Sequence, residues 1–220
     1  MIRDYLSFMI KGITFFSTIL WSLLTVFSVH AQQPAFDFSS LAPNQDAAVF
    51  AGGCFWCMEP PYDSMDGVVA TISGYTGGSM RNPTYQQVIR GGTGHYEAVL
   101  VVFEPSRVSY EQLLEVFWFN VDPLDPGGQF CDRGEMYRTG IFPRTPAQAQ
   151  AARASRDALD RSGRLRSPIV TEILNAGAFY VAEEYHQDYY LKNPLRYRTY
   201  RVGCGRDARL RQLWGADAPY

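Results

Sequence analysis

The stretch AAVFAGGCFWCMEPPY, residues 47–62, joins a short apolar run to two glycines and then to two cysteines three positions apart. The apolar run is typical of a buried strand. Gly52 and Gly53 let the backbone turn sharply from that strand into a helix. This stretch therefore predicts a strand, a tight turn and a short helix, with a thiol placed at the turn.

Cys54 lies at the predicted start of that helix. Unpaired N–H groups of a first helical turn point at a thiol in this position, which lowers its pKa and favours the nucleophilic thiolate. Pro60 and Pro61 do not fit a regular helix interior, so we expect a helix of one turn, or one kinked near Trp56 and Cys57. The effect on the thiol survives this interruption because it depends on the first turn.

The rest of the chain alternates predicted strands with predicted helices. Four further runs are predicted strands: GVVATISGYTGG (67–78), HYEAVLVVFEP (95–105), YRTGIF (137–142) and SPIVTEIL (167–174). Ser or Thr followed three positions later by Gln predicts helix starts at Thr84, Ser109 and Thr145, and Gly163 ends the last of these helices. This order predicts an α+β or α/β domain in two layers, with a sheet of mixed direction.

The first 31 residues have the pattern of a signal peptide. A charged start precedes the uncharged run GITFFSTILWSLLTVFSV (12–29), and small residues stand before the expected cut after Ala31. We expect an exported protein, in the periplasm or outside the cell. The alternative is an uncleaved membrane anchor, since about 18 uncharged positions approach the length that spans a bilayer. Residues 32–46 predict a linker to a single domain at 47–220.

Composition and spacing disfavour several classes of function. The formal net charge is -2 and the basic residues are scattered, so nothing favours nucleic acid binding. Four cysteines are too few for a scaffold that depends on disulfides, and Cys131 and Cys204 are too isolated for a zinc site. The stretch 121–136 and the tail from about Asn193 lack periodicity, and we expect irregular loops there that are functional or mobile.

The residues alone leave the Cys54–Cys57 pair with several interpretations. An inert or disulfide-bonded structural pair is one, and half of a metal site is a weaker one. A thioredoxin-like dithiol is another, although Phe55 and Trp56 stand where that family has Gly and Pro.

Glu97 is a carboxylate in an otherwise apolar predicted strand. Burial there would raise its pKa and make it a proton donor near neutral pH. The alternative is a glutamate on an exposed strand face. His95, two positions earlier, is expected to be a structural hydrogen bonder rather than a base.

Five colinear stretches, spread over roughly residues 48–190, together resemble peptide methionine sulfoxide reductase of the A type. They are GGCFWCMEPPYDSMDGV, SGYTGGSMRNPTYQQVIRGGTGHYEAVLVVFEP, SYEQLLEVFW, DPLDPGGQFCDRGEMYRTGIF and FYVAEEYHQDY. Gly-Cys-Phe-Trp with Gly-Thr-Gly-His-x-Glu downstream is the most specific part. The resemblance implies a ferredoxin-like α/β sandwich with additions, and reduction of the S epimer of methionine sulfoxide, free or in proteins.

The resemblance also implies separate roles for the thiol and for its aromatic neighbours. Cys54 matches the nucleophile that attacks the sulfoxide sulfur and becomes a sulfenic acid. Phe55 and Trp56 match the apolar wall that receives the substrate methyl group. A sulfoxide carries a polar S–O dipole beside an apolar methyl, so a selective site needs such a wall opposite hydrogen-bond donors.

The donors implied by the resemblance lie further along the chain. Tyr85 and Tyr137 match two tyrosines near the sulfoxide oxygen, and Glu97 matches the acid that protonates it. Displacement at sulfur pushes charge onto oxygen, and preorganised donors stabilise that charge. Asp132 matches an aspartate that orients the substrate, with capping of its own loop as the alternative role.

The sequence departs from the commonest family pattern in three places. Val121 stands where the family usually has His, and Cys131 stands beside Asp132 where Gly and Pro are usual. The tail carries a single cysteine, Cys204, so its equivalence to the recycling cysteines of the family is open.

The identity of the resolving thiol is also open. Cys204 is favoured because its flanking glycines suggest a mobile arm that reaches Cys54. Cys57, on the same first turn as Cys54, is the second candidate. Cys131 is third, because its loop also carries Asp132.

These observations favour an exported thiol reductase for oxidised methionine. The electrons would come from a thioredoxin-like reductant, with no metal, flavin or nicotinamide, and membrane association is expected only if the N-terminal segment is uncleaved. The alternative enzyme is a general dithiol–disulfide oxidoreductase, and the alternative outside catalysis is a binding or structural domain with inert disulfides.

Overall fold

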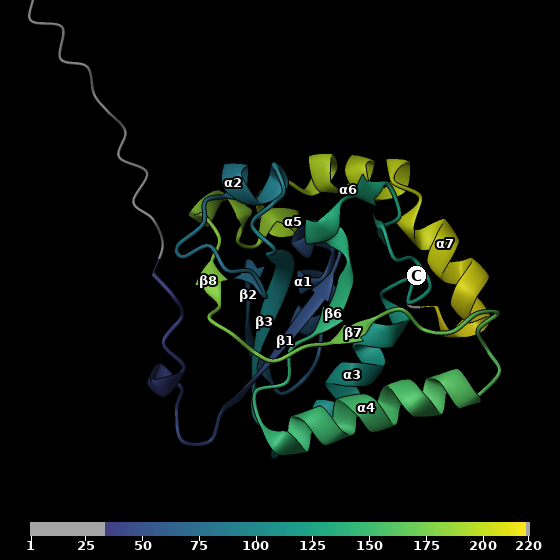
Figure 1. Cartoon of the computed structure of the whole chain (residues 1–220), viewed down its shortest axis with the longest axis horizontal. Coiled ribbons are helices and arrows are strands. Elements are labelled where there is room, and N and C mark those ends of the chain that lie inside the picture. Colours follow the sequence, from purple (N-terminus) through teal and green to yellow (C-terminus); the bar gives the residue numbers. More distant parts are fainter. Residues whose placement is uncertain (1–33, 219–220) are drawn as a thin grey trace, which may run out of the picture. The chain divides into compact units, whose positions relative to one another are not determined.

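The computed structural model describes residues 34–218 (Figure 1). The predicted signal peptide and the first two positions of the predicted linker lie outside the described residues. Within the described part of the chain, no helix combines the length and the apolar character needed to cross a bilayer.

A six-stranded sheet runs through the described part of the chain, in the order β7-β6-β1-β3-β2-β8. Its strands are β1 (Asp46–Gly52), β2 (Val68–Thr76), β3 (Tyr96–Phe103), β6 (Thr139–Ile141), β7 (Glu172–Ile173) and β8 (Tyr180–Val181). β7 pairs parallel with β6, and the other pairs are antiparallel. The strand predictions are confirmed, although the last two predicted runs contribute only three and two residues to the sheet.

The helices are α1 (Glu59–Asp63), α2 (Tyr85–Ile89), α3 (Tyr110–Phe119), α4 (Pro146–Arg161), α5 (Tyr189–Lys192), α6 (Pro194–Gly203) and α7 (Arg206–Trp214). Thr84, Ser109 and Thr145 cap α2, α3 and α4 as predicted, each accepting a hydrogen bond from the N–H three positions on. Gly163, at φ +70°, follows the end of α4.

The central part of the fold is ferredoxin-like, as expected. β1, α1, β2, β3, α3 and β6 follow one another in a βαββαβ order, and their strands lie side by side as β6-β1-β3-β2. Both helices pack on one face of the sheet, and their core with that face includes Phe50, Met58, Tyr62, Val99, Val101, Leu113 and Phe117. β7 and β8 extend the sheet at its two edges.

The opposite face is covered mainly by irregular chain, with one short 3₁₀ helix at Phe38–Ser40. Phe36, Phe38 and Leu41 pack against a second apolar cluster on that face, and the Phe36 N–H donates to the Phe179 carbonyl at 2.7 Å. The predicted linker over 32–46 therefore packs against the sheet from about Ala35 onward as it leads into the domain. Three apolar side chains in that short stretch find an uncovered sheet face, which periodicity alone does not reveal.

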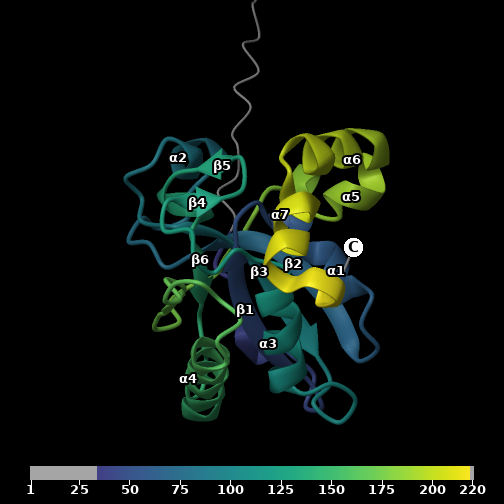
Figure 2. The same cartoon turned by 90° about the vertical axis from the view of Figure 1, so that its right-hand side faces the viewer.

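The prediction of an irregular tail from Asn193 is wrong, because α6 and α7 occupy it. In α7 the buried side chains are Arg206, Leu210 and Trp214, four positions apart, which is a helical repeat. An arginine fills one of the three buried positions, so the repeat is hidden from a pattern of apolar residues. Figure 2 shows α2 and α5–α6 near one end of the sheet and α4 near the other.

Candidate active site

Cys54 lies immediately beyond the end of β1, at the turn that the glycines were predicted to make. Gly53 has φ +83°, and a Cβ at Gly52 would lie 2.5 Å from the Met58 Sδ. The chain then forms a one-turn 3₁₀ helix, Phe55–Cys57, as expected. Pro60 and Pro61 do not kink that turn; they lie in the first turn of α1, where missing N–H groups are tolerated.

The thiols of Cys54 and Cys57 are buried and hydrogen-bonded to each other. That hydrogen bond, with the positive charges of Arg206 and Arg201, lowers the pKa of Cys57 to about 6. Burial raises the pKa of Cys54 well above its usual range. The pair therefore holds one proton between two sulfurs near neutral pH.

The predicted helix-start effect on Cys54 is wrong in sign. The Phe55 N–H, which would have faced the thiol, donates instead to Glu97 Oε2 at 3.2 Å. Burial is the largest cause of the raised pKa of Cys54, and the hydrogen bond to Cys57 is the next. The thiolate that the site needs is supplied by the pair rather than by the helix.

Glu97 is buried near the start of β3, on the same face as Val99 and Val101, because alternate strand residues share a face. Burial raises the pKa of its carboxyl group to about 8, against the hydrogen bonds from the Phe55 N–H and the Tyr137 side chain. The prediction of a buried carboxyl with a raised pKa is confirmed. His95 also behaves as expected: its ring nitrogens bond the Gly78 N–H and the Met80 carbonyl, at 3.2 and 2.7 Å.

Tyr85, at the start of α2, and Tyr137, just before β6, meet beside Glu97. Their side chains hydrogen-bond to each other, and Tyr137 also hydrogen-bonds to Glu97. Burial raises the pKa of both phenols above the ordinary value, with the charge of Glu97 as the next cause, so both keep their protons. The structure thus brings together Cys54, Glu97 and both tyrosines from four separate segments.

Trp56 and Phe55 occupy different depths. Trp56 is half-buried and stacks on Tyr189 of α5 at 3.7 Å between ring centroids, while its Nε1 donates to His186 Nδ1 at 3.0 Å. Phe55 is buried beneath, 4.9 Å from the His186 ring. Both rings contact His186, and only Trp56 keeps part of its surface exposed.

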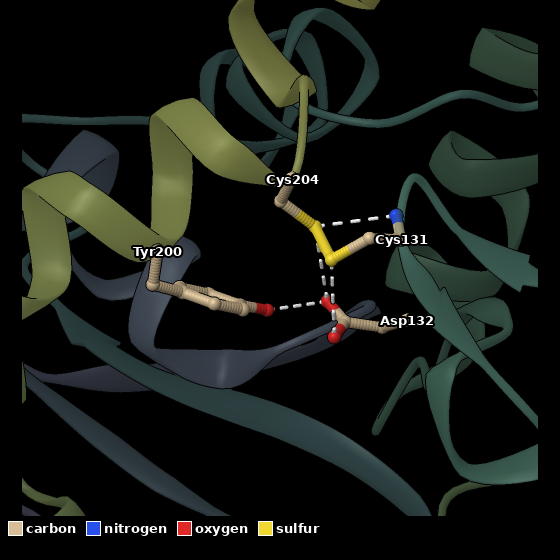
Figure 3. The surroundings of a disulfide bond; sticks show 4 residues. All are labelled: Cys131, Asp132, Tyr200 and Cys204. Atoms are coloured by element: carbon tan, nitrogen blue, oxygen red, sulfur yellow. Dashed lines mark hydrogen bonds between the residues drawn. A yellow bond between two sulfur atoms is a disulfide. The ribbon is translucent and has the colours of Figure 1, made fainter.

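Cys204 does not form the mobile arm that its glycines suggested. It caps the C-terminus of α6 and is joined to Cys131 by a disulfide, whereas Cys54 and Cys57 remain free thiols in the described structure (Figure 3). In this state the Cys204 sulfur is bonded to Cys131 and is not a free thiol, so the ranking of Cys204, Cys57 and Cys131 as resolving thiols stays a prediction. Flanking glycines here allow a tight turn between two helices, since Gly205 has φ +71°.

Asp132 lies beside this disulfide. The Tyr200 hydroxyl donates to its carboxylate, so Asp132 links its hairpin to α6 rather than capping its own loop. Burial raises the pKa of Asp132, against the effects of Tyr200 and Arg206. Cys131, Asp132 and Cys204 are the metal-ligand side chains that gather most closely in the described chain, within 4.8 Å, but their two sulfurs are bonded to each other.

Sequence reasoning assigned no role to several residues that build this site: Glu183, His186, Tyr189, Tyr200 and Arg206. Glu183 fixes the start of α2, because its carboxylate accepts the Tyr85 N–H at 2.8 Å. Burial lowers the pKa of His186 to about 4, so it is neutral and accepts the Trp56 hydrogen bond. His186 and Tyr189 lie in FYVAEEYHQDY, a stretch that carried the resemblance and could have been searched for aromatic partners. No local signal marked Tyr200 or Arg206, because both act across long sequence separations.

Comparison with known proteins agrees with this geometry. The family model for peptide methionine sulfoxide reductase matches residues 46–218. The peptide methionine sulfoxide reductase MsrA of Bacillus licheniformis is 52% identical over 175 residues, covering 80% of this chain and 97% of the relative. MsrA 2 of Caulobacter vibrioides is 53% identical, with 79% and 88% covered.

Solved structures give the same result. Methionine sulfoxide reductase A of Corynebacterium diphtheriae matches with a TM-score of 0.64 at 36% identity, over 74% of this chain and 82% of that one. Mxr1 of Saccharomyces cerevisiae in reduced form matches with a TM-score of 0.65 at 29% identity, over 72% and 89%. The chain belongs to the peptide methionine sulfoxide reductases, enzymes that reduce methionine sulfoxide to methionine.

Proposed function

We propose that this chain reduces the S epimer of methionine sulfoxide, free or in proteins, with Cys54 as the nucleophile. The observation that carries the proposal is a buried thiol pair placed beside a carboxyl group that keeps its proton at neutral pH. Sulfoxide reduction needs both groups, whereas disulfide exchange needs no acid for a leaving oxygen. The choice of epimer rests on the membership of the family.

In the first step the Cys54 sulfur attacks the sulfoxide sulfur and takes its oxygen, which releases methionine and leaves a sulfenic acid. The Cys57 thiolate accepts the proton that Cys54 gives up, and Glu97 protonates the oxygen. Tyr85 and Tyr137 donate hydrogen bonds to the oxygen while charge develops on it. Trp56 receives the substrate methyl group.

In the second step the Cys57 thiol attacks the sulfenic acid, which forms a Cys54–Cys57 disulfide and releases water. Cys57 is the resolving thiol because it already hydrogen-bonds to Cys54, whereas Cys204 is bonded to Cys131. A dithiol of the thioredoxin type then reduces the Cys54–Cys57 disulfide and restores the proton on Glu97. The cycle balances with thiols as the sole source of electrons.

We also propose that the enzyme is exported and matures by cleavage after Ala31. The support is the charged start, the uncharged run at 12–29 and the small residues before the cut. Its substrates would then be oxidised proteins outside the cytoplasm. Association with a membrane follows only if the segment is retained.

The test is incubation of the mature protein with the S and R sulfoxides of a blocked methionine, with dithiothreitol as reductant. We expect methionine from the S epimer alone, and Cys54→Ser should reduce the rate by at least about a hundredfold, as is usual when a nucleophile is lost. Equal use of both epimers would contradict the stereochemical assignment. Reduction of insulin disulfides without sulfoxide reduction would support the general oxidoreductase instead.

A further inference from the structure

A second cysteine pair lies close to the proposed active site. Cys131, in the hairpin formed by β4 (Gly128–Gln129) and β5 (Asp132–Arg133), is bonded to Cys204 at the junction of α6 and α7, 73 positions away (Figure 3). Cys131 is exposed and Cys204 is half-buried, whereas Cys54 and Cys57 are buried. Dissolved thiols therefore reach the Cys131–Cys204 disulfide more readily than the catalytic pair.

The disulfide closes a ring of contacts around Asp132. The Asp132 carboxylate oxygens lie 3.7 Å from the Cys131 sulfur and 3.9 Å from the Cys204 sulfur. The same carboxylate accepts the Tyr200 hydroxyl hydrogen bond. Tyr200 lies one helical turn before Cys204, and the Cys204 N–H donates to the Tyr200 carbonyl at 2.8 Å. The covalent bond and the hydrogen bond thus join the same hairpin to the same end of α6.

Tyr200 also contacts Trp56, which forms the proposed apolar surface for the substrate. Its ring lies edge-on to Trp56, with 5.9 Å between centroids. The hairpin backbone is held by the pairs Gly128–Arg133 and Gln129–Asp132 and by the Arg133–Asp125 ion pair. The Asp132 carboxylate is held separately, by the Tyr200 hydroxyl of α6 and by its contact with the two sulfurs. The orientation of that carboxylate therefore depends on its attachment to α6.

We propose that Cys131 and Cys204 are positioning residues: their disulfide is a clasp that holds Asp132 against Tyr200 for substrate binding, and its reduction weakens that binding. The proposal rests on the proposed function, because it assigns substrate binding to this face of the site. Reduction by a dithiol converts the disulfide to two thiols with two electrons and two protons, and the dithiol becomes a disulfide. The affinity of the enzyme for oxidised methionine therefore falls when dithiols in its surroundings reduce the clasp.

The experiment compares single-turnover reduction of a blocked methionine S-sulfoxide, without added reductant, in two forms of the wild type. One form is fully reduced and kept anaerobic. The other carries the Cys131–Cys204 disulfide with Cys54 and Cys57 reduced, prepared by mild oxidation with diamide. Alkylation and peptide mapping verify the redox state of each preparation.

We expect the substrate concentration for half-maximal rate to be about tenfold higher in the reduced form, the effect of loosening one hydrogen bond to a charged group. The maximal rate should stay within about twofold, because the reacting groups are untouched. Equal half-saturation concentrations, or a change confined to the maximal rate, would overturn the clasp.

Two variants separate positioning from general stability. The double variant Cys131→Ser, Cys204→Ser should have the half-saturation concentration of the reduced wild type. Treatment with diamide should not change that concentration. Tyr200→Phe in the disulfide form should reproduce most of the weakening, and should add little to the double serine variant, since both act on Asp132. Full additivity would assign the two effects to independent causes and contradict the proposal.

Hydrogen exchange gives a readout that does not depend on activity. Reduction should raise exchange at 128–133 and 197–205 while β1 and β3 stay protected. If this change appears and no sulfoxide is reduced, the proposed function fails and the clasp's role in substrate binding fails with it, leaving a structural bond. If sulfoxide is reduced and exchange is unchanged, the clasp alone is refuted.

Discussion

Glu97→Gln should make the protein more stable above neutral pH while it removes activity. In the folded state the Glu97 carboxyl keeps its proton up to about pH 8, because burial raises its pKa from the ordinary 4.5. The unfolded chain loses that proton near pH 4.5. Between these values the unfolded state binds fewer protons, so the free energy of unfolding falls as pH rises.

The size of this effect follows from the two pKa values. Each pH unit between 4.5 and about 8 lowers the wild-type free energy of unfolding by about 1.4 kcal/mol through this group, or about 5 kcal/mol at most. Glutamine does not titrate and its amide oxygen can still accept the Phe55 N–H. The stability of the variant relative to wild type should therefore grow by a few kcal/mol from pH 5 to pH 8.

Urea unfolding at pH 5, 6, 7 and 8 measures this difference. The control is Glu115→Gln, the same substitution at an exposed position of α3. Other titrating groups, such as Glu59, cancel in the comparison because they are present in every protein. A Glu97→Gln variant whose stability changes with pH in parallel with wild type would refute the raised pKa.

The sulfoxide reductase activity of Glu97→Gln should fall, although its stability relative to wild type rises. Without an acidic proton for the departing oxygen, the sulfoxide step of Glu97→Gln should slow by about 10² to 10⁴, the usual contribution of a general acid. In wild type the single-turnover rate should fall above about pH 8 as the carboxyl ionises, and the variant should lack that fall. An unchanged single-turnover rate in the variant would refute the acid role.

Three further outcomes are expected. Cys57→Ser should release one methionine per enzyme and then stop with thioredoxin as reductant; steady turnover, measured by methionine release, would return the resolving role to Cys204. Tyr85→Phe and Tyr137→Phe should each slow the sulfoxide step less than Glu97→Gln, because each hydroxyl partly replaces the other, and single-turnover kinetics will show the order. The mature N-terminus should be Gln32 by mass spectrometry of the exported protein, and an intact Met1 in a membrane fraction would contradict cleavage.

Much of the fold was predictable because its signals are local. Apolar runs located β1, β2 and β3, and a hydroxyl side chain followed by glutamine located the starts of α2, α3 and α4. The helices of the tail were missed because their buried positions include Arg201 and Arg206, which a hydrophobic pattern counts as exposed. The packed segment near Phe36 was missed because it covers a sheet face with little more regular structure than one 3₁₀ turn.

Sequence spacing could not predict which of the four cysteines form a disulfide and which remain free thiols. Two lie three positions apart and share a proton, while the other two meet across 73 positions. Glycines beside Cys204 are compatible with a mobile arm and with a tight helix junction, and only the packing of α7 distinguishes them. Local sequence thus located the Cys54–Cys57 pair, and tertiary structure is needed to show which cysteines bond to each other.

The two titrations at the site define a common pH window. The thiol pair supplies a thiolate above about pH 6, and Glu97 supplies a proton below about pH 8. Arg206 supports the lower limit, because its buried guanidinium lowers the pKa of Cys57. The guanidinium is fixed there by the carbonyls of Gly52 and Asn120, at 3.0 and 2.8 Å. Because backbone carbonyls rather than a carboxylate accept its hydrogen bonds, the Arg206 charge acts on the Cys57 thiolate as well as on Asp132.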